Sequence, residues 1–154
     1  MRIALGLLGV VLLLLMGQSG AAIADTTGDK KIVGNVVIYM GLLPAEMIRG
    51  HPADHPEASM HGGAPKGVGA YHVVFALFSA KTGQRITNAD VTARVNEMGL
   101  AGEQKKLEPM EIAGTETYGN YFPMIGAGPF RITLTIHLPG DPGELRAVFE
   151  HKHK

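Results

Sequence analysis

The feature that most constrains this chain is a series of short β-type segments separated by clusters of glycine and proline. The clearest of them covers residues 130–138, where apolar residues alternate with polar ones at Ile132, Leu134, Ile136 and Leu138. Alternation of this kind is typical of a strand with one buried face and one solvated face. A Pro-Gly-Asp-Pro-Gly turn follows directly. The segment therefore predicts a strand that packs one face on a core.

Six further segments have the composition of strands, at residues 32–39, 71–78, 90–95, 105–112, 118–124 and 145–149. The segment 71–78 is apolar on both faces, which is typical of a central strand. Pro109 places 105–112 at a sheet edge or a bulge. Residues 43–48 and 89–100 have room for a helical turn, but neither has the length of a real helix. The sequence therefore predicts an all-β, immunoglobulin-like antiparallel β-sandwich of about seven strands.

Residues 1–24 have the pattern of a secretory signal peptide. Arg2 precedes an apolar run over residues 3–16, and Ala22-Ile23-Ala24 forms a small-residue cleavage site before Asp25. The run is shorter than the roughly 20 residues that cross a bilayer, so we expect no stable membrane insertion after cleavage. We predict export to the periplasm as a single β-sandwich domain over residues 25–154.

Composition excludes several classes of function. The absence of cysteine excludes disulfide scaffolds, Cys-ligated zinc, iron–sulfur centres and blue copper. The 14 basic residues balance 14 acidic ones, and they form no cluster that would favour nucleic acid as a partner. Neither Ser59 nor Ser79 lies in a G-x-S-x-G motif, and metalloprotease, P-loop and Rossmann patterns are absent. We therefore predict that the chain is not an enzyme.

One long segment, at residues 50–69, interrupts the β pattern with histidine, proline and glycine. It is longer than most structural connections, and such loops in compact domains are commonly functional. It holds four potential metal ligands, and a fifth follows at the start of the central strand; the set is His51, His55, Met60, His61 and His72. Imidazole is the commonest metal ligand, and a thioether adds preference for Cu(I). We predict that three or four of these residues bind one metal ion. Copper, as Cu(I) or Cu(II), is favoured, and zinc is the alternative.

The same segment has a simpler interpretation as a solvated loop that binds no metal. If the chain is extended, His51 and His55 lie about 13 Å apart and cannot share an ion. Pro56 disfavours a helix at His55, although a tight turn would still bring the two imidazoles together. In this alternative the chain is a metal-free exported β-sandwich that acts as a protein-interaction or scaffolding module.

Other potential ligands have ordinary structural explanations. The remaining methionines, Met110 and Met124 among them, are expected to fill gaps in the core. Tyr71 is expected to be a sheet residue. The closing His-Lys-His-Lys segment, residues 151–154, is expected to be a frayed tail that makes a poor metal site.

Several of these features occur together in a known group of proteins. They are a Cys-free sandwich, a His/Met loop before the 71–78 strand, and a closing Gly128-Pro129-Phe130-Arg131-Ile132 strand that leads to Pro139-Gly140. Over about residues 32–149 the chain resembles the periplasmic YtkA-like and CopC-like immunoglobulin-type domains of copper handling.

The resemblance implies a copper carrier or chaperone, with a membrane metal transporter or a metalloenzyme under assembly as its partner. CopC-like proteins often bind Cu(II) through the mature N-terminal amine and a histidine at that terminus. The terminus expected here, Asp25-Thr26-Thr27, lacks that histidine.

Overall fold

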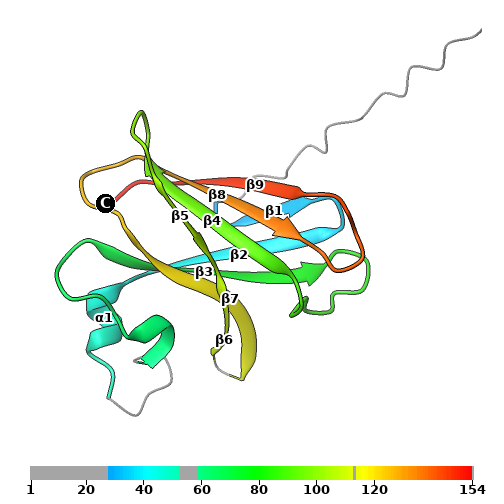
Figure 1. Cartoon of the computed structure of the whole chain (residues 1–154), viewed down its shortest axis with the longest axis horizontal. Coiled ribbons are helices and arrows are strands. Elements are labelled where there is room, and N and C mark those ends of the chain that lie inside the picture. The colour runs from blue at the N-terminus through cyan, green and yellow to red at the C-terminus, as the bar shows by residue number, and fades with distance from the viewer. Residues whose placement is uncertain (1–27, 53–58, 113, 154) are drawn as a thin grey trace, which may run out of the picture.

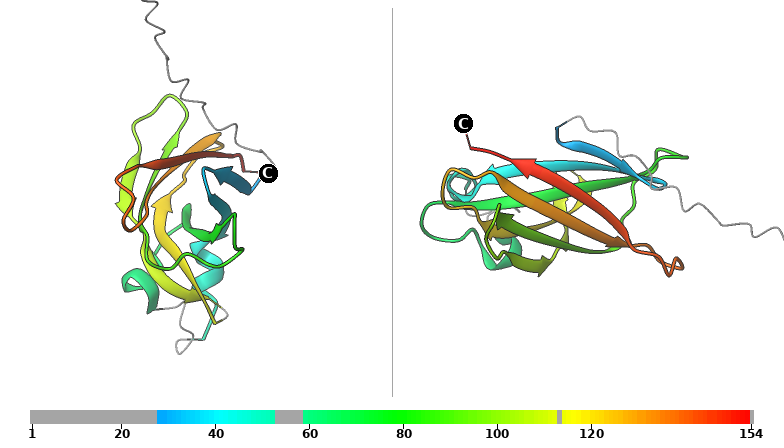
Figure 2. Two further views of the ribbon diagram at one scale, coloured as in Figure 1. Left: turned by 90° about the vertical axis from the view of Figure 1, so that its right-hand side faces the viewer. Right: turned by 90° about the horizontal axis from the view of Figure 1, so that it is seen from above.

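The computed structural model describes residues 28–52, 59–112 and 114–153, which form two antiparallel sheets packed face to face (Figures 1 and 2). One sheet has five strands in the order β1 (Lys30–Val33), β2 (Val36–Pro44), β3 (Ala70–Ser79), β7 (Thr115–Pro123) and β6 (Glu108–Ile112). The other has four, in the order β5 (Glu103–Lys106), β4 (Asp90–Glu97), β8 (Phe130–His137) and β9 (Leu145–His151). The predicted all-β sandwich is confirmed. The predicted signal peptide and His55 lie outside the described residues.

The core lies between the two sheets and is built from alternate residues of each strand. Val73, Phe75 and Leu77 of β3 belong to the same buried cluster as Ile132, Leu134 and Ile136 of β8, and all six are at most 1% exposed. The predicted alternation of 130–138 is confirmed by this burial. The segment predicted as a central strand is also confirmed, because β3 lies in the middle of the five-stranded sheet.

The prediction of one strand over residues 32–39 is wrong, because the chain makes a hairpin there. Val33 of β1 pairs with Val36 of β2, and Gly34 and Asn35 form the two-residue turn. Gly34 has φ +56°, and a glycine with positive φ at the first central position is the signature of a type II′ hairpin turn. The surrounding run of β-branched residues hides this turn in the sequence.

The prediction of one strand over residues 105–112 is also wrong, because this segment contributes to both sheets. Residues before Leu107 form β5 in one sheet and residues after it form β6 in the other. Leu107 is 1% exposed, and its backbone N–H donates to the carbonyl of Val91. Pro109 lies on the edge strand β6, as predicted. These two divisions explain why the described residues form nine strands where about seven were predicted.

Two short helical segments cover one end of the outer face of the five-stranded sheet: α1 (Ala45–Arg49) and η1 (Met60–Gly62) (Figure 1). Ala45 and Ile48 of α1 are fully buried and pack on Tyr121 of β7. Arg49 donates hydrogen bonds to the carbonyls of Pro65 and Gly67 and holds the segment after η1 beside the helix. Within the described ranges, no helix has the length and apolar character needed to span a membrane.

The expectation of a frayed C-terminal tail is wrong for residues 151–153. His151 is the last residue of β9 and pairs with Phe130 of β8. His153 packs on Tyr71 with ring centroids 5.0 Å apart. The closing histidines therefore belong to the folded structure.

Leu107→Ala is expected to lower the free energy of unfolding by about 2–5 kcal/mol, because it leaves a cavity where the chain crosses between the sheets. Urea denaturation measures the change. Leu100→Ala is the control, because Leu100 is 63% exposed, and its effect should stay within about 0.5 kcal/mol. A change at position 107 as small as that of the control would contradict the role of Leu107 in the core.

Candidate metal centre

The structure brings two of the five predicted ligands, His61 and His72, into contact. His72 lies on β3 and is 1% exposed, with its side chain on the outer face of the sheet. His61 belongs to η1, which covers that face, and its side chain is 4% exposed. The two ring centroids are 5.2 Å apart. A rigid strand and a covering loop thus place two imidazoles side by side in a buried position.

The other three predicted ligands are His51, Met60 and His55, and the structure assigns none of them to this pair. His51 is exposed and follows α1, where its backbone N–H donates to the carbonyl of Ile48. Met60 is half-buried at the start of η1. His55 lies outside the described residues. The participation of these three residues in metal binding stays a prediction.

A carboxylate on β6 orients the His61 ring. Nδ1 of His61 lies 2.7 Å from Oε2 of Glu108, whose side chain is 58% exposed. Nδ1–H therefore donates to the carboxylate, and Nε2 of His61 carries the lone pair. In many metal-ligating histidines, the ring nitrogen that does not bind the metal donates such a hydrogen bond, which fixes the tautomer. Glu108 thus holds the imidazole in the form that binds a metal.

The remaining nitrogens of the two rings define the centre of the site. Within the described part of the chain, Nε2 of His61 and Nε2 of His72 are buried and have no hydrogen-bond partner. Buried polar atoms nearly always have a partner, because burying one without it costs roughly 1–3 kcal/mol. Two such atoms in adjacent rings are what a shared metal ion would satisfy. The donor set therefore fits a metal.

Gly119 of β7 lets a methionine approach the same point. A Cβ at this position would lie 2.0 Å from Cε of Met110 and 3.1 Å from Nε2 of His72. The side chain of Met110 and the imidazole of His72 therefore meet in the space that the glycine leaves. Met110 is buried but belongs to neither core cluster. The burial agrees with the expectation that Met110 fills a gap, although the gap lies on the outer face of the sheet, beside His72. In that position its thioether is also a potential third ligand.

Tyr121 of β7 forms an aromatic wall of the site. Its ring stacks on His72 at 4.6 Å and meets the edge of the His61 ring at 5.8 Å. The stacking follows from the β3–β7 register, in which His72 and Tyr121 are direct partners. The ring adds to the burial of both imidazoles and keeps water away from His72.

Burial, and secondarily the nearby His61, lower the pKa of His72 to about 4. Desolvation disfavours the charged imidazolium, and a second imidazole does the same when it is protonated. His72 is therefore neutral at pH 7. A metal can bind this nitrogen without displacing a proton from it, which favours binding under mildly acidic conditions as well.

His61 has a backbone conformation that is uncommon for a residue with a side chain. Its φ is +55° and its ψ is +31°, in the left-handed region that costs a non-glycine residue roughly 1–2 kcal/mol. Residues in such conformations concentrate at functional sites, where the surroundings hold them in place. Here the hydrogen bond to Glu108 and the packing on Tyr121 hold the residue.

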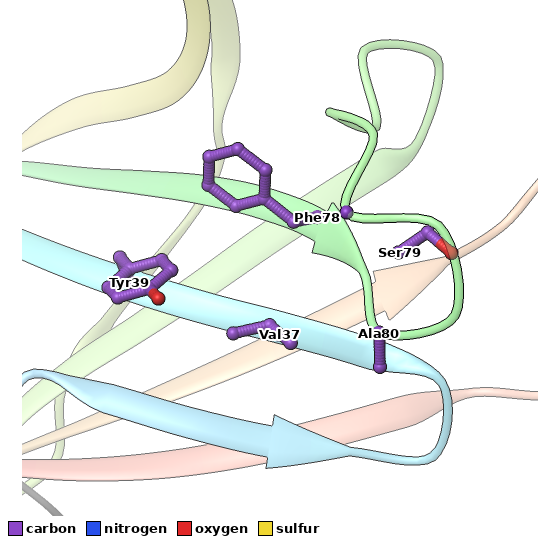
Figure 3. A pocket seen from close by; sticks show the side chains of 6 residues that line it. Val37, Tyr39, Phe78, Ser79 and Ala80 are labelled. Atoms are coloured by element: carbon purple, nitrogen blue, oxygen red, sulfur yellow. The ribbon is translucent and has the colours of Figure 1, made fainter.

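A hollow in the surface lies at the other end of β3, away from the histidine pair (Figure 3). It has a volume of about 260 Å³ and is lined by Val37, Tyr39, Phe78, Ser79, Ala80 and Gly83. Imidazoles and carboxylates are absent from this lining.

Across the described ranges, no three His, Cys, Asp or Glu side chains are grouped so as to hold a metal. A metal at His61 and His72 would therefore depend on the thioether as a further ligand.

Sequence reasoning missed Glu108 and Met110, which lie on a strand far from the histidine loop in the sequence. The available signal was weak. Glu108 and Met110 are two residues apart on an edge strand, so their side chains lie on the same face. A methionine on the solvated face of an edge strand is unusual. Nothing in the local pattern links that face to His61 or His72, because the link is the β3–β7–β6 order of the sheet.

Comparison with known proteins gives matches of structure only: the sequence matches no protein-family model and no curated protein. FetP of uropathogenic Escherichia coli has a TM-score of 0.62 at 15% identity, covering 86% of this chain and 97% of FetP. A copper-bound variant of Campylobacter jejuni P19 has a TM-score of 0.63 at 15% identity, covering 82% and 94%. A DUF4426 family protein from Pseudomonas aeruginosa has 0.58 at 14%, covering 81% and 94%. The chain shares the sandwich fold of these proteins.

The low pKa of His72 predicts a pH-dependent stability of the metal-free protein. The unfolded chain takes up a proton below pH 6.5, whereas folded His72 takes it up only near pH 4. Acidification from pH 7 to pH 4 should therefore remove about 3 kcal/mol from the free energy of unfolding.

Denaturant unfolding at several pH values measures this contribution. The His72→Leu variant should lose it and have a flatter profile, while His137→Leu, which removes an exposed imidazole, should keep the steep one. Parallel profiles for the wild type and His72→Leu would contradict a strongly shifted His72.

Proposed function

We propose that this chain is a periplasmic copper-binding protein that carries Cu(I) between Nε2 of His61 and Nε2 of His72, with the thioether of Met110 as the third ligand. The observation that carries the proposal is the pair of buried, adjacent imidazole nitrogens without a hydrogen-bond partner in the described residues. The buried methionine beside His72 supports it.

The chemistry of the three donors favours copper over other metals. Thioether sulfur selects soft ions, and imidazole binds both states of copper. Structural zinc sites usually have four ligands, most often thiolates, imidazoles and carboxylates. Calcium and magnesium require oxygen ligands. The carboxylate of Glu108 contacts the other nitrogen of His61. A site with two imidazoles and one thioether suits Cu(I) best.

The structural neighbours support both copper and the periplasm. Variants of FetP and of P19 are described as copper-bound, and FetP was expressed in the periplasm. The signal-peptide pattern at residues 1–24 of this chain supports the same compartment. The shared fold and the histidine pair thus support one function by separate routes.

The arrangement of the ligands supports a carrier over a permanent store. His72 and Met110 lie on strands, whereas His61 lies on a loop and is held in a left-handed conformation. Glu108, which holds His61, is more than half exposed at the rim of the site. A small movement of η1 would withdraw one ligand and expose the ion. We propose that a membrane metal transporter or a metalloenzyme under assembly receives the copper.

The double variant His61→Ala/His72→Ala is expected to lower Cu(I) affinity by at least ~100-fold. Loss of an outer hydrogen-bond partner alone costs 10- to 100-fold, and loss of two ligands should cost more. Anaerobic titration against a chromophoric Cu(I) chelator measures the affinity. His137→Ala is the matched control and should bind Cu(I) as the wild type does. Equal affinities of the wild type and the double variant would favour the metal-free scaffolding alternative.

Met110→Leu tests the sulfur ligand separately. Leucine keeps a similar volume, so the fold should be retained while Cu(I) affinity falls by about 10-fold or more. Zinc affinity should change little, because zinc has small preference for a thioether. Isothermal titration with each ion compares the two. Met124→Leu is the control, because Met124 lies in the core. An unchanged Cu(I) affinity of Met110→Leu would remove the methionine from the ligand set.

A further inference from the structure

A second group of imidazoles lies where the end of β9 approaches the start of β3. Nε2 of His151 is 3.3 Å from Nδ1 of His153, and the hydroxyl of Tyr71 is 3.2 Å from the same Nδ1. The His153 ring also packs against Phe130, with centroids 5.1 Å apart. In Figure 1 the C-terminal end of the chain lies at the same end of the sandwich as α1. Two potential metal-binding atoms thus lie within 3.3 Å of Nδ1 of His153, outside the His61–His72 centre.

The hydrogen bonds of His153 show which of its nitrogens is available. Nε2 of His153 lies 3.0 Å from the carbonyl oxygen of Met124. A carbonyl only accepts, so Nε2 carries the proton and Nδ1 carries a lone pair. Metal-ligating histidines commonly donate their second N–H to a backbone carbonyl in this way. His153 is therefore oriented as a ligand with Nδ1 toward His151 and Tyr71.

The spacing of these atoms also matches that of metal ligands. Nδ1 of His153 has a single lone pair, so only one of the two neighbours can donate a proton into it. The distances of 3.2 and 3.3 Å match the separation between ligand atoms around a tetrahedral ion. That separation is about 3.3–3.4 Å for metal–nitrogen bonds near 2.0–2.1 Å. One cation bound to Nδ1 of His153 would be within reach of either neighbour.

The charge state of the cluster also suits a cation. Burial, and secondarily the nearby His153, lower the pKa of His151, while the carboxylate of Asp29 acts in the opposite direction. The Asp29 carboxylate places a negative charge close to the group, which favours a bound positive ion.

We propose that His151, His153 and Tyr71 form a second metal site that takes a divalent cation of borderline softness, Cu(II) or Zn(II). Two imidazoles and a phenolate oxygen suit these ions; Tyr71 would release its proton to solvent when the ion binds. The absence of a thioether among the three donors removes the preference for Cu(I). Tyr71 and His72 are neighbours on β3, and their side chains lie on opposite faces of the sheet. The second site is therefore separate from the first and does not depend on it.

The test uses the full processed chain without an added histidine tag. Cu(II) alone and Zn(II) alone are titrated into the wild type, His61→Ala/His72→Ala and His151→Ala/His153→Ala, with His137→Ala as the control. The site predicts that one divalent ion still binds after the first double change. The affinity of the second site for this ion should fall by at least ~100-fold in His151→Ala/His153→Ala, because two ligands are lost. The two titrations show which ion binds more tightly.

Tyr71→Phe is a milder variant that keeps the ring and its packing. It should weaken divalent-ion binding by about 10-fold and abolish the phenolate-to-Cu(II) charge-transfer absorption of the wild type. If neither change at Tyr71 nor loss of His151 and His153 alters divalent-ion binding, the second site is wrong. Loss of all divalent-ion binding in His61→Ala/His72→Ala would also overturn it, whereas Cu(I) binding in that variant tests the first site alone.

Discussion

The burial of a single imidazole, that of His72, on the central strand of a sheet is the constraint on which the candidate centre depends. The strand cannot move this side chain without breaking pairs with both β2 and β7. The ring is therefore fixed, desolvated and neutral at pH 7. A neutral nitrogen in a dry position needs a partner, and the structure supplies a second imidazole and a thioether next to it. The other features of the site hold these neighbours in place.

The two sites that we propose share the same part of the scaffold. His72 lies on the outer face of β3, whereas Tyr71, next to it, packs against the core between the sheets, and its hydroxyl contacts His153 just beyond the end of β9. The first group combines nitrogen with sulfur and is buried, and the second combines nitrogen with oxygen and is half-buried. Ligand softness and exposure therefore differ across a single strand, and this difference would sort ions by oxidation state.

The local sequence pattern predicted the sandwich and its central strand, and it singled out His61 and His72 as potential ligands. Alternation over residues 130–138 and the apolar run at 71–78 are signals that a single segment contains. The hairpin at Gly34 and the crossing at Leu107 were missed because each lies inside a continuous run of strand-like residues. Met110 and Glu108 were missed for a different reason. They reach His72 and His61 through the β3–β7–β6 strand order, and no sequence period reports which strands are neighbours.

The measurement that tests the central claim most directly is X-ray absorption at the copper edge on the Cu(I)-loaded protein, because it identifies the atoms bound to the ion. The account predicts one tightly bound copper with two imidazole nitrogens and one sulfur in its first shell. A first shell of nitrogen and oxygen alone, or copper bound without imidazole, would contradict the assignment of His61, His72 and Met110 as the ligands.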